Sequence, residues 1–257
     1  MIPEKMRKDR KRKILQSSTR LGIIVLLLIL WEILPRLGVI HPIILAPFSS
    51  VFQAAIGEYT RILINLKVTA IEIAIAIAIA WGFGLVLGVA LGSNKTVCDV
   101  FVPLVSSIYA IPIVVIYPIL AAWFGLGIQS KYLFGGIYGL FPVVLNTVAG
   151  IRGVEARFIF LAKSIGASRV QTITKIIVPL SLPGILPGIR LGAALAVIGV
   201  VVAEMLASSA GIGFMIEYNR TIFKTANVYM AILVVIGIVA AIDRLLFFIE
   251  KKLVYWN

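Results

Sequence analysis

The sequence has very few of the side chains that metal sites, disulfides and most catalytic centres use. Its 257 residues include one cysteine, Cys98, and one histidine, His41. A single cysteine excludes an intrachain disulfide framework and a multi-cysteine metal site, and a single histidine argues against a histidine-based metal site or catalytic triad. No Gly-Lys pair occurs, which excludes a phosphate-binding loop of the GxxxxGK[ST] type. We therefore expect a chain that is not an enzyme and that binds no cofactor or metal itself.

Charged residues are also scarce, at 14% of the chain, whereas 61% of the residues are hydrophobic. The hydrophobic residues form several runs of roughly 20 or more residues with at most one charge, the length that crosses a hydrocarbon core of about 30 Å. The run Ile73–Ala80 alternates with a period of two, as strands do. A lone strand would leave its backbone unpaired in lipid, so we predict a helix there as well. The sequence predicts an all-α polytopic membrane protein.

Six transmembrane helices are predicted, at about residues 21–40, 68–92, 100–123, 131–150, 184–206 and 228–249. With the N-terminus in the cytoplasm, 18 of the 24 lysines and arginines lie on the cytoplasmic side and 6 on the other side. The positive-inside rule therefore favours cytoplasmic termini and a cytoplasmic loop at 151–183.

The basic N-terminal tail, residues 1–20, precedes the transmembrane domain, residues 21–257. Its apolar continuation is too long for a cleavable signal peptide. We interpret the tail as a topology signal that is also attracted to anionic lipid. The net charge of +13 is attributed to this membrane orientation and not to nucleic-acid binding, since no soluble basic face of the right size is left over.

Glycine and proline positions predict how the helices pack. Two small-residue ladders occur in the second and fifth predicted helices, at Gly84, Gly88 and Gly92 and at Gly184, Gly188 and Gly192. Such ladders let helix backbones approach closely in lipid. Prolines should kink or interrupt the third and fourth helices, at Pro112, Pro118 and Pro142. A kink of this kind either lines a cavity or serves packing alone, and the sequence leaves both open.

The predicted cytoplasmic loop contains its own helices. Apolar residues recur at helical spacing between Glu155 and Ile177, and Gly166-Ala-Ser168 divides this stretch in two. Gly166 suits the position after a helix C-cap, and Ser168 suits an N-cap. The outward face of the first helix carries Arg157, Lys163 and Ser164. From the residues alone, this helix either binds a partner protein or lies on the membrane surface.

The segments that identify a family run in order from about Leu45 to the C-terminus. They are Ile111-Pro112, Trp123-Phe-Gly-Leu-Gly127, Phe141-Pro-Val-Val-Leu-Asn-Thr147, Gly150-Ile-Arg152, Ser164-Ile-Gly-Ala-Ser168, Ile176-Ile-Val-Pro-Leu-Ser-Leu-Pro-Gly-Ile185, Gly188-Ile-Arg-Leu191 and Val201-Val-Ala-Glu-Met205. Together they resemble the permease subunit of bacterial ABC importers of the nitrate, sulfonate and taurine type. The resemblance implies the type I ABC importer permease fold, with a cytoplasmic coupling helix, in a bacterial or archaeal plasma membrane.

The resemblance also implies partners. These are a second permease chain in a homodimer, two ATP-binding cassette subunits that use ATP and Mg²⁺, and an extracytoplasmic substrate-binding protein. Residues implied in ATPase coupling are Leu161, Ala162, Lys163, Ser164, Gly166, Ala167 and Ser168. An elbow stiffened by Pro179, Pro183 and Pro187 would transmit the motion of the coupling helix to the fifth span, and the pathway would open by alternating access.

One position departs from the family pattern. The hallmark loop has Glu-Ala-Ala, three residues and then Gly, and the aligned tripeptide is Phe160-Leu-Ala162, followed by Gly166. The glutamate and the first alanine are therefore absent. We expect the docking contact to depend on shape and apolar packing around Leu161 and Ala162.

Charges within the spans are candidates for function, because they are costly in lipid. Arg190, near the cytoplasmic end of the fifth span, is predicted to extend to the headgroups. Glu204 lies near its outer end, where it either lines the pathway or gate or serves as a structural partner, for example of the loop 207–227. Glu72 and the pair Asp243/Arg244 lie near span ends and are interpreted as structural. Candidate residues of the pathway or gate are Pro112, Asn146 and Glu204.

Two other classes were weighed against the importer. An ATP-independent channel or secondary transporter should show a central charged relay and an internal repeat, and the sequence shows neither. A membrane enzyme needs clustered histidine or acidic residues at one depth, and the acids are scattered. The sequence does not select among the substrates of this family, which include nitrate, bicarbonate, sulfonates, taurine and vitamin precursors.

Overall fold

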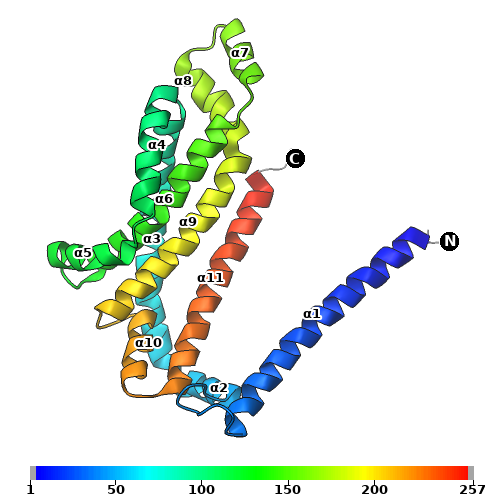
Figure 1. Cartoon of the computed structure of the whole chain (residues 1–257), viewed down its shortest axis with the longest axis vertical. Coiled ribbons are helices and arrows are strands. Elements are labelled where there is room, and N and C mark those ends of the chain that lie inside the picture. The colour runs from blue at the N-terminus through cyan, green and yellow to red at the C-terminus, as the bar shows by residue number, and fades with distance from the viewer. Residues whose placement is uncertain (1–3, 254–257) are drawn as a thin grey trace.

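The computed structural model describes residues 4–253, and within these residues it contains helices and no strand (Figure 1). The α-helices are α1 (Glu4–Arg36), α2 (Phe48–Gly57), α3 (Tyr59–Gly92), α4 (Lys95–Tyr109), α5 (Tyr117–Phe124), α6 (Ile128–Arg152), α7 (Ala156–Ser164), α8 (Arg169–Thr172), α9 (Val178–Leu206), α10 (Ile212–Thr221) and α11 (Thr225–Leu253). A 3₁₀ turn, Ile113–Ile116, precedes α5, and a π turn, Ile173–Ile177, joins α8 to α9. The chain is an all-helical membrane protein.

Among the described residues, five helical stretches are long and apolar enough to cross a membrane. They are Ser18–Arg36, Tyr59–Gly92, Ile128–Arg152, Arg169–Leu206 and Thr225–Lys251. A sixth crossing exists if the bent pair Lys95–Tyr109 and Ile113–Phe124 counts as one span. The predicted basic tail, residues 1–20, lies largely outside the residues whose side chains are described.

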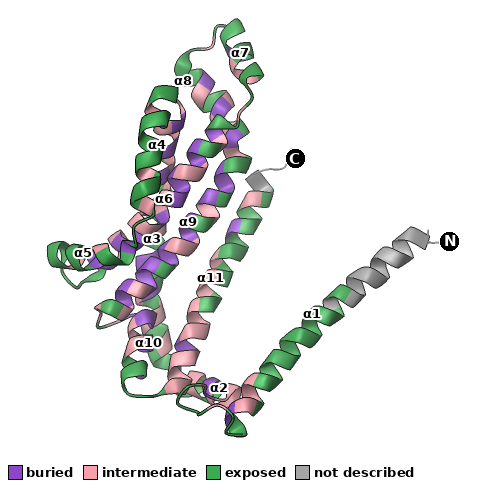
Figure 2. Cartoon of the chain, in the orientation of Figure 1, coloured by how far each residue is buried: buried purple, intermediate pink, exposed green. Residues whose placement is uncertain are grey.

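Helix α6 packs against both α3 and α9, and these three helices carry much of the buried surface in Figure 2. A Cβ atom added at Gly84 or Gly88 of α3 would lie 2.7 Å from Val143 or 2.5 Å from Thr147 of α6. The predicted ladder in α3 is therefore confirmed as a contact surface. Glycine allows the two backbones to approach this closely.

The second ladder packs on the other side of α6. A Cβ atom at Gly184 would lie 2.7 Å from the Cα atom of Gly150, and one at Gly188 would contact Asn146. At the next turn, Gly192 and Gly139 face each other through their backbones. Small residues on both helices thus bring α6 and α9 into contact, as the sequence pattern predicted.

The third predicted span, 100–123, is broken. Its two halves are bent by 83° at the break next to Pro112, which caps the 3₁₀ turn. Pro118 lies in the first turn of α5, where a missing N–H costs nothing. By contrast, α6 continues through Pro142 without a break. The expected interruption therefore occurs in the third span and is absent from the fourth.

Helix α9 is also not interrupted at Pro179, Pro183 and Pro187, where the sequence predicted an elbow. Pro179 lies in the first turn of α9, and the other two prolines lie inside this helix. Each proline lacks an N–H, and a spacing of four places the lost hydrogen bonds on one side of the helix. The irregular backbone hydrogen bonding lies in the π turn, Ile173–Ile177, immediately before α9. The helical path is therefore continuous from Arg169 to Leu206.

Helix α1 diverges from the bundle and meets it near α2 (Figure 1). The Trp31 indole donates to the carbonyl of Ala46 over 2.9 Å. The Glu32 carboxylate accepts from both the backbone N–H and the hydroxyl of Ser49, each at 2.9 Å. Ser49 is in the first turn of α2, so Glu32 accepts from one of the N–H groups that a helix start leaves unpaired. Its negative charge also interacts favourably with the helix dipole at that end.

The close contact of α6 with α9 gives a testable expectation for Gly139→Ala. The new methyl group would press on the Gly192 carbonyl, so we expect a loss of about 1–3 kcal/mol of stability. A matched control is Gly82→Ala in α3, where nothing lies within 4 Å of the added Cβ atom. The control should be neutral or stabilising by up to about 1 kcal/mol, because alanine favours helix more than glycine does. Thermal unfolding in detergent measures both, and equal midpoints would contradict the packing.

Candidate functional site

Helix α7 forms the end of the molecule farthest from α10, and it packs mainly on α8 and the π turn (Figure 1). It begins after Glu155, whose carboxylate pairs with Arg157 at 2.8 Å. It ends in a Schellman motif, in which the Gly166 N–H donates to the Lys163 carbonyl and the Ala167 N–H to the Ala162 carbonyl, both at 3.0 Å. The helix is short, and its end is closed by hydrogen bonds.

The turn between α7 and α8 has the geometry that the sequence predicted. Gly166 has φ of +75°, in the left-handed region that glycine adopts without a Cβ penalty. Ser168 is the N-cap of α8, and its hydroxyl accepts from the Gln171 N–H while the Gln171 side chain accepts from the Ser168 N–H. This reciprocal capping box confirms the predicted division of the loop into two helices.

The surface of α7 exposes large apolar side chains. Phe160 and Ile165 are each 73% exposed and Leu161 is 59% exposed, whereas Ala162 is fully buried. The other predicted coupling residues, Lys163, Ser164, Gly166 and Ser168, are exposed, and Ala167 is partly buried. Phe160, Leu161 and Ile165 form what we call the α7 apolar surface. An exposed apolar patch on a rigid, capped element is typical of a protein-binding site.

The three candidate pathway residues do not come together. Pro112 is exposed at the break before α5. Asn146 donates its side-chain N–H to the Pro142 carbonyl of its own helix at 2.8 Å, and it packs against Gly188 of α9. Glu204 is 1% exposed near the end of α9. The structure therefore gives them no shared cavity within one chain.

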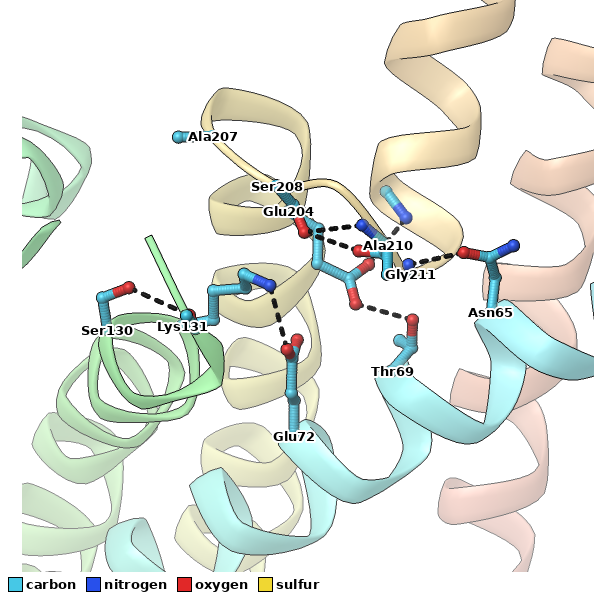
Figure 3. A network of polar contacts seen from close by, with 12 residues as sticks. Asn65, Thr69, Glu72, Ser130, Lys131, Glu204, Ala207, Ser208, Ala210 and Gly211 are labelled. Carbon is cyan, nitrogen blue, oxygen red and sulfur yellow. Dashed lines mark hydrogen bonds and ion pairs between the residues drawn. The ribbon is translucent and has the colours of Figure 1, made fainter. Parts of the chain in front are cut away.

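Glu204 instead joins α9 to α3 and α10 (Figure 3). One of its oxygens accepts from the Thr69 hydroxyl and the other from the Gly213 N–H, both at 2.7 Å. Of the two roles that the sequence left open for Glu204, this geometry is that of a structural partner of the loop after α9. Its role in transport stays a prediction.

The N-terminus of α10 is held entirely by side chains from other helices. The Gly211 N–H donates to Asn65 at 2.7 Å, the Ile212 N–H to the Thr69 hydroxyl at 2.8 Å, and the Gly213 N–H to Glu204. These three donors are among the groups that a helix start leaves unpaired. The contact is also tight, because a Cβ atom at Gly211 or Gly213 would press on Glu204.

A buried ion pair adjoins this contact. Lys131 at the start of α6 lies 3.1 Å from Glu72 of α3, and the two side chains are 4% and 0% exposed. We call the set Asn65, Thr69, Glu72, Lys131 and Glu204 the α10 network. Sequence reasoning did not single out Lys131 or pair it with Glu72. The sequence feature that could have indicated this ion pair is a lysine and a glutamate within or at the edge of apolar runs, where an unpaired charge is costly.

Arg190, whose extension to the headgroups stays a prediction, makes ion pairs with another helix. It pairs with Asp243 at 2.6 Å and with Glu250 at 3.3 Å, both on α11. Asp243, interpreted as structural from the sequence, joins α9 to α11 through this pair. The sequence could not show it, because 53 residues separate the partners.

The fold and these surfaces define a helical membrane component in which a capped helix with an apolar surface lies at one end. Residues 80–255 match the family of binding-protein-dependent transport system inner membrane components. The chain belongs to this family.

Individual relatives agree with the assignment. The chain is 31% identical to a putative aliphatic sulfonates transport permease of Bacillus subtilis, over 99% of this chain and 93% of that protein. It is 30% identical to the taurine transport system permease of Escherichia coli, over 94% and 90% of the two chains. Among solved structures, it matches a chain of the methionine ABC transporter MetNI in an inward-facing conformation with a TM-score of 0.65, at 15% identity, over 72% of this chain and 93% of that one.

These findings identify the chain as the permease subunit of an ABC importer, an inner-membrane protein that crosses the membrane several times. Membership of this family implies ATPase and substrate-binding partners. The role is transport and not catalysis by this chain.

The α10 network gives a prediction with an internal control. Thr69→Val removes the hydroxyl that links the Ile212 N–H to Glu204, so two buried polar groups lose a partner and stability should fall by about 1–3 kcal/mol. Thr147→Val is the control, because Thr147 is equally buried and its hydroxyl has no hydrogen-bond partner. We expect the control to be neutral or stabilising. Thermal unfolding compares the two variants, and a Thr69→Val chain as stable as Thr147→Val would contradict the network.

Proposed function

We propose that this chain forms the substrate pathway of an ATP-driven importer by alternating access, and that α7 is the coupling helix which docks on an ATPase subunit. The observation that carries the proposal is the α7 apolar surface. It lies on a helix that is capped at its C-terminal end and stands apart from the bundle. Coupling requires that the docking helix moves as a rigid body with its partner. The Schellman hydrogen bonds hold the C-terminal end of α7 in a fixed shape, which meets this requirement.

The proposed contact at α7 uses an apolar surface, which supports the expectation drawn from the missing hallmark glutamate. Phe160 occupies the position of that glutamate and is exposed beside Leu161. Burial of apolar area at about 25 cal/mol per Å² makes such a surface a source of binding energy. Docking through shape and apolar contact follows from this, while the charged face with Lys163 stays available for a complementary rim.

Motion at α7 has a direct path to the far end of the molecule. The helical path from Arg169 to Leu206 has 38 residues, which at about 1.5 Å per residue is a rod of roughly 57 Å. Its first part contains the π turn and three prolines, and its last turn carries Glu204 of the α10 network. We infer that α9 transmits the displacement of the ATPase subunits as a rigid-body tilt.

The orientation in the membrane follows from chain direction and charge. Helix α1 runs toward the α2 end and α11 runs away from it, so the two ends of the described chain lie on the α7 side of the α2 end (Figure 1). The positive-inside count places that side in the cytoplasm. We therefore infer cytoplasmic termini and a cytoplasmic α7.

The assembly that we propose has two permease chains, two ATP-binding cassette subunits and one extracytoplasmic binding protein. ATP and Mg²⁺ would bind the cassette subunits, and this chain would hold neither. In the part of this chain that the structure describes, no group of three or more histidine, cysteine or acidic residues could hold a metal ion. We propose a homodimer of the permease. The windows of α1 and α11 that are most apolar are each only 6% buried within one chain, which leaves surface for lipid and for a second copy.

The substrate proposal is a small anion or small organic solute. It is supported by two relatives, whose names state aliphatic sulfonates and taurine. The candidate pathway residues Pro112, Asn146 and Glu204 remain proposals, and of these only Pro112 is exposed on one chain. Thermal-shift measurements on the cognate binding protein with sulfonates, taurine and nitrate test the substrate class.

The turn after α7 gives a test of coupling. Gly166→Val should abolish substrate-stimulated ATPase activity in the assembled transporter, because valine is strained at φ of +75° and the Schellman turn would change shape. Nothing lies within 4 Å of an added Cβ atom, so the effect is conformational and the membrane helices should stay folded. Gly166→Asn is the matched control, since asparagine tolerates the left-handed region and should keep most of the stimulation. Full stimulation in the valine variant would count against α7 as the coupling helix.

The apolar surface gives a second test. Phe160→Ala with Leu161→Ala should weaken retention of the ATPase subunits at least tenfold, because two exposed apolar side chains of about 1.5 kcal/mol or more each are truncated. Lys95→Ala, at an exposed position in the first turn of α4, is the control. Copurification of the ATPase subunits with the permease measures the effect. Equal retention by both variants would show that docking lies elsewhere.

A further inference from the structure

The α10 network contains two buried carboxylates, those of Glu72 and Glu204. The proposed coupling and the ion pair with Lys131 do not account for the presence of both. Glu72 of α3 is 0% exposed and Glu204 of α9 is 1% exposed. They come from neighbouring helices, and the Thr69 hydroxyl and the Lys131 ammonium that bond to them belong to the same network. Figure 3 shows the two carboxylates approaching from neighbouring helices, with Lys131 and Thr69 beside them.

The hydrogen bonds of this pair are unequal. Both oxygens of Glu204 accept a bond, one from Thr69 and one from the Gly213 N–H. In Glu72, Oε1 accepts from the Lys131 ammonium, whereas Oε2 is buried and has no hydrogen-bond partner. Two ionised carboxylates are acceptors only, so they cannot bond to each other unless one of them carries a proton. A buried acceptor without a donor costs about 1–3 kcal/mol.

The charges of the site are also unbalanced if every group is ionised. The titratable groups that face it are Glu72 from α3, Lys131 from α6, Glu204 from α9 and Tyr117 from α5, whose hydroxyl donates to the Ala207 carbonyl at 3.3 Å. The groups that α10 contributes to these bonds are backbone N–H groups. Two carboxylates and one ammonium leave a net charge of one negative unit, which is costly away from water.

We propose that Glu204 binds one proton and donates it to Oε2 of Glu72. This single proton satisfies the unpaired oxygen and makes the group of Glu72, Lys131 and Glu204 electrically neutral. Glu72 stays ionised as the counter-charge of Lys131, while Glu204 keeps its bonds from Thr69 and Gly213, which come from neutral donors. Carboxyl pairs that share one proton are a known response to crowding of two acids.

The space around Glu204 favours a proton over a metal cation. Gly211 and Gly213 approach its carboxylate so closely that even a methyl group on either would press on it. Among the described residues, no cluster of histidine, cysteine and acidic groups has the composition of a metal site. The site therefore fits a proton shared between one oxygen of Glu204 and one oxygen of Glu72.

The proton also ties α10 to the rest of the fold. Glu204 and Thr69 hold the first N–H groups of α10, and Glu72 with Lys131 joins the same site to α6. A glutamate in an unfolded chain is ionised at neutral pH, so unfolding releases the proton. Since the native state then binds more protons than the unfolded state, stability must fall as the pH rises.

Infrared difference spectroscopy of the full-length chain in lipid nanodiscs tests the proposal directly. At neutral pH we expect the C=O band of a protonated carboxylic acid in the wild type. Glu204→Gln should remove it, and Glu217→Gln should leave it unchanged. Glu217 is the matched control, because its hydrogen bond with Arg220 holds the pKa of its carboxyl below the ordinary value. A wild-type spectrum without this band, or a band that survives Glu204→Gln, would overturn the proposal.

Thermal unfolding gives a second readout. As the pH rises above neutral, the midpoint of the wild type should fall, and that of Glu204→Gln should change less, because the amide carries its hydrogens permanently. At pH 7, Glu72→Gln should destabilise more than Glu204→Gln, since it leaves Lys131 without a counter-charge, and adding Lys131→Met to Glu72→Gln should recover part of the loss. A Glu204→Gln chain that is as unstable as Glu72→Gln would show that Glu204 is ionised, which contradicts the assignment.

Discussion

The close approach of α6 to α3 and α9 is the constraint on which the rest of the structure depends. In lipid there is no hydrophobic force between helices, so their association relies on packing and on polar contacts. Glycines on facing helices remove the side chains that would hold the backbones apart, as at Gly84, Gly88, Gly139 and Gly192. The three helices therefore form one body. The remaining helices are placed relative to that body.

The α10 network is a product of this packing. Its members come from α3, α6 and α9, and the hydrogen-bonded pair Thr69 and Glu204 is separated by 135 residues in the chain. Polar side chains at the ends of three tightly packed helices reach one another, and together they hold the start of a fourth helix. Burial makes each of these contacts strong when it is complete and costly when one partner is absent. The same burial explains why the charge balance of the site matters.

Helix α9 connects this network with α7. Near α7 it is preceded by a π turn and contains prolines, both of which weaken the regular hydrogen bonding of a helix. Along its middle it is packed tightly against α6. In the proposed coupling, weaker helical hydrogen bonding near α7 would let α7 change its angle, while the tightly packed part of α9 would move as a unit. This division is consistent with the proposed transmission of ATPase motion.

Much of the local structure could be predicted from sequence, because it depends on neighbouring residues. Gly166 and Ser168 marked the helix end and the next helix start, since backbone conformation and capping are local properties. The glycine ladders were also recognisable from their spacing. The effect of prolines was less predictable. Pro112 lies at a break, whereas Pro142 and Pro183 lie within helices. Whether a helix continues through proline depends on what its neighbours supply to the freed carbonyl groups.

The sequence by itself determined that the chain crosses the membrane as helices, that it resembles an importer permease, and that a structured loop follows the fourth predicted span. These properties can be read from the chain segment by segment, because they depend on hydropathy, on charge and on the order of the motifs. Only the tertiary structure decided the partners of Glu72, Lys131, Arg190 and Glu204, because a buried charge takes the partner that packing brings to it. A charge in an apolar run announces that a partner is needed, and the helices that meet in space determine which one it is.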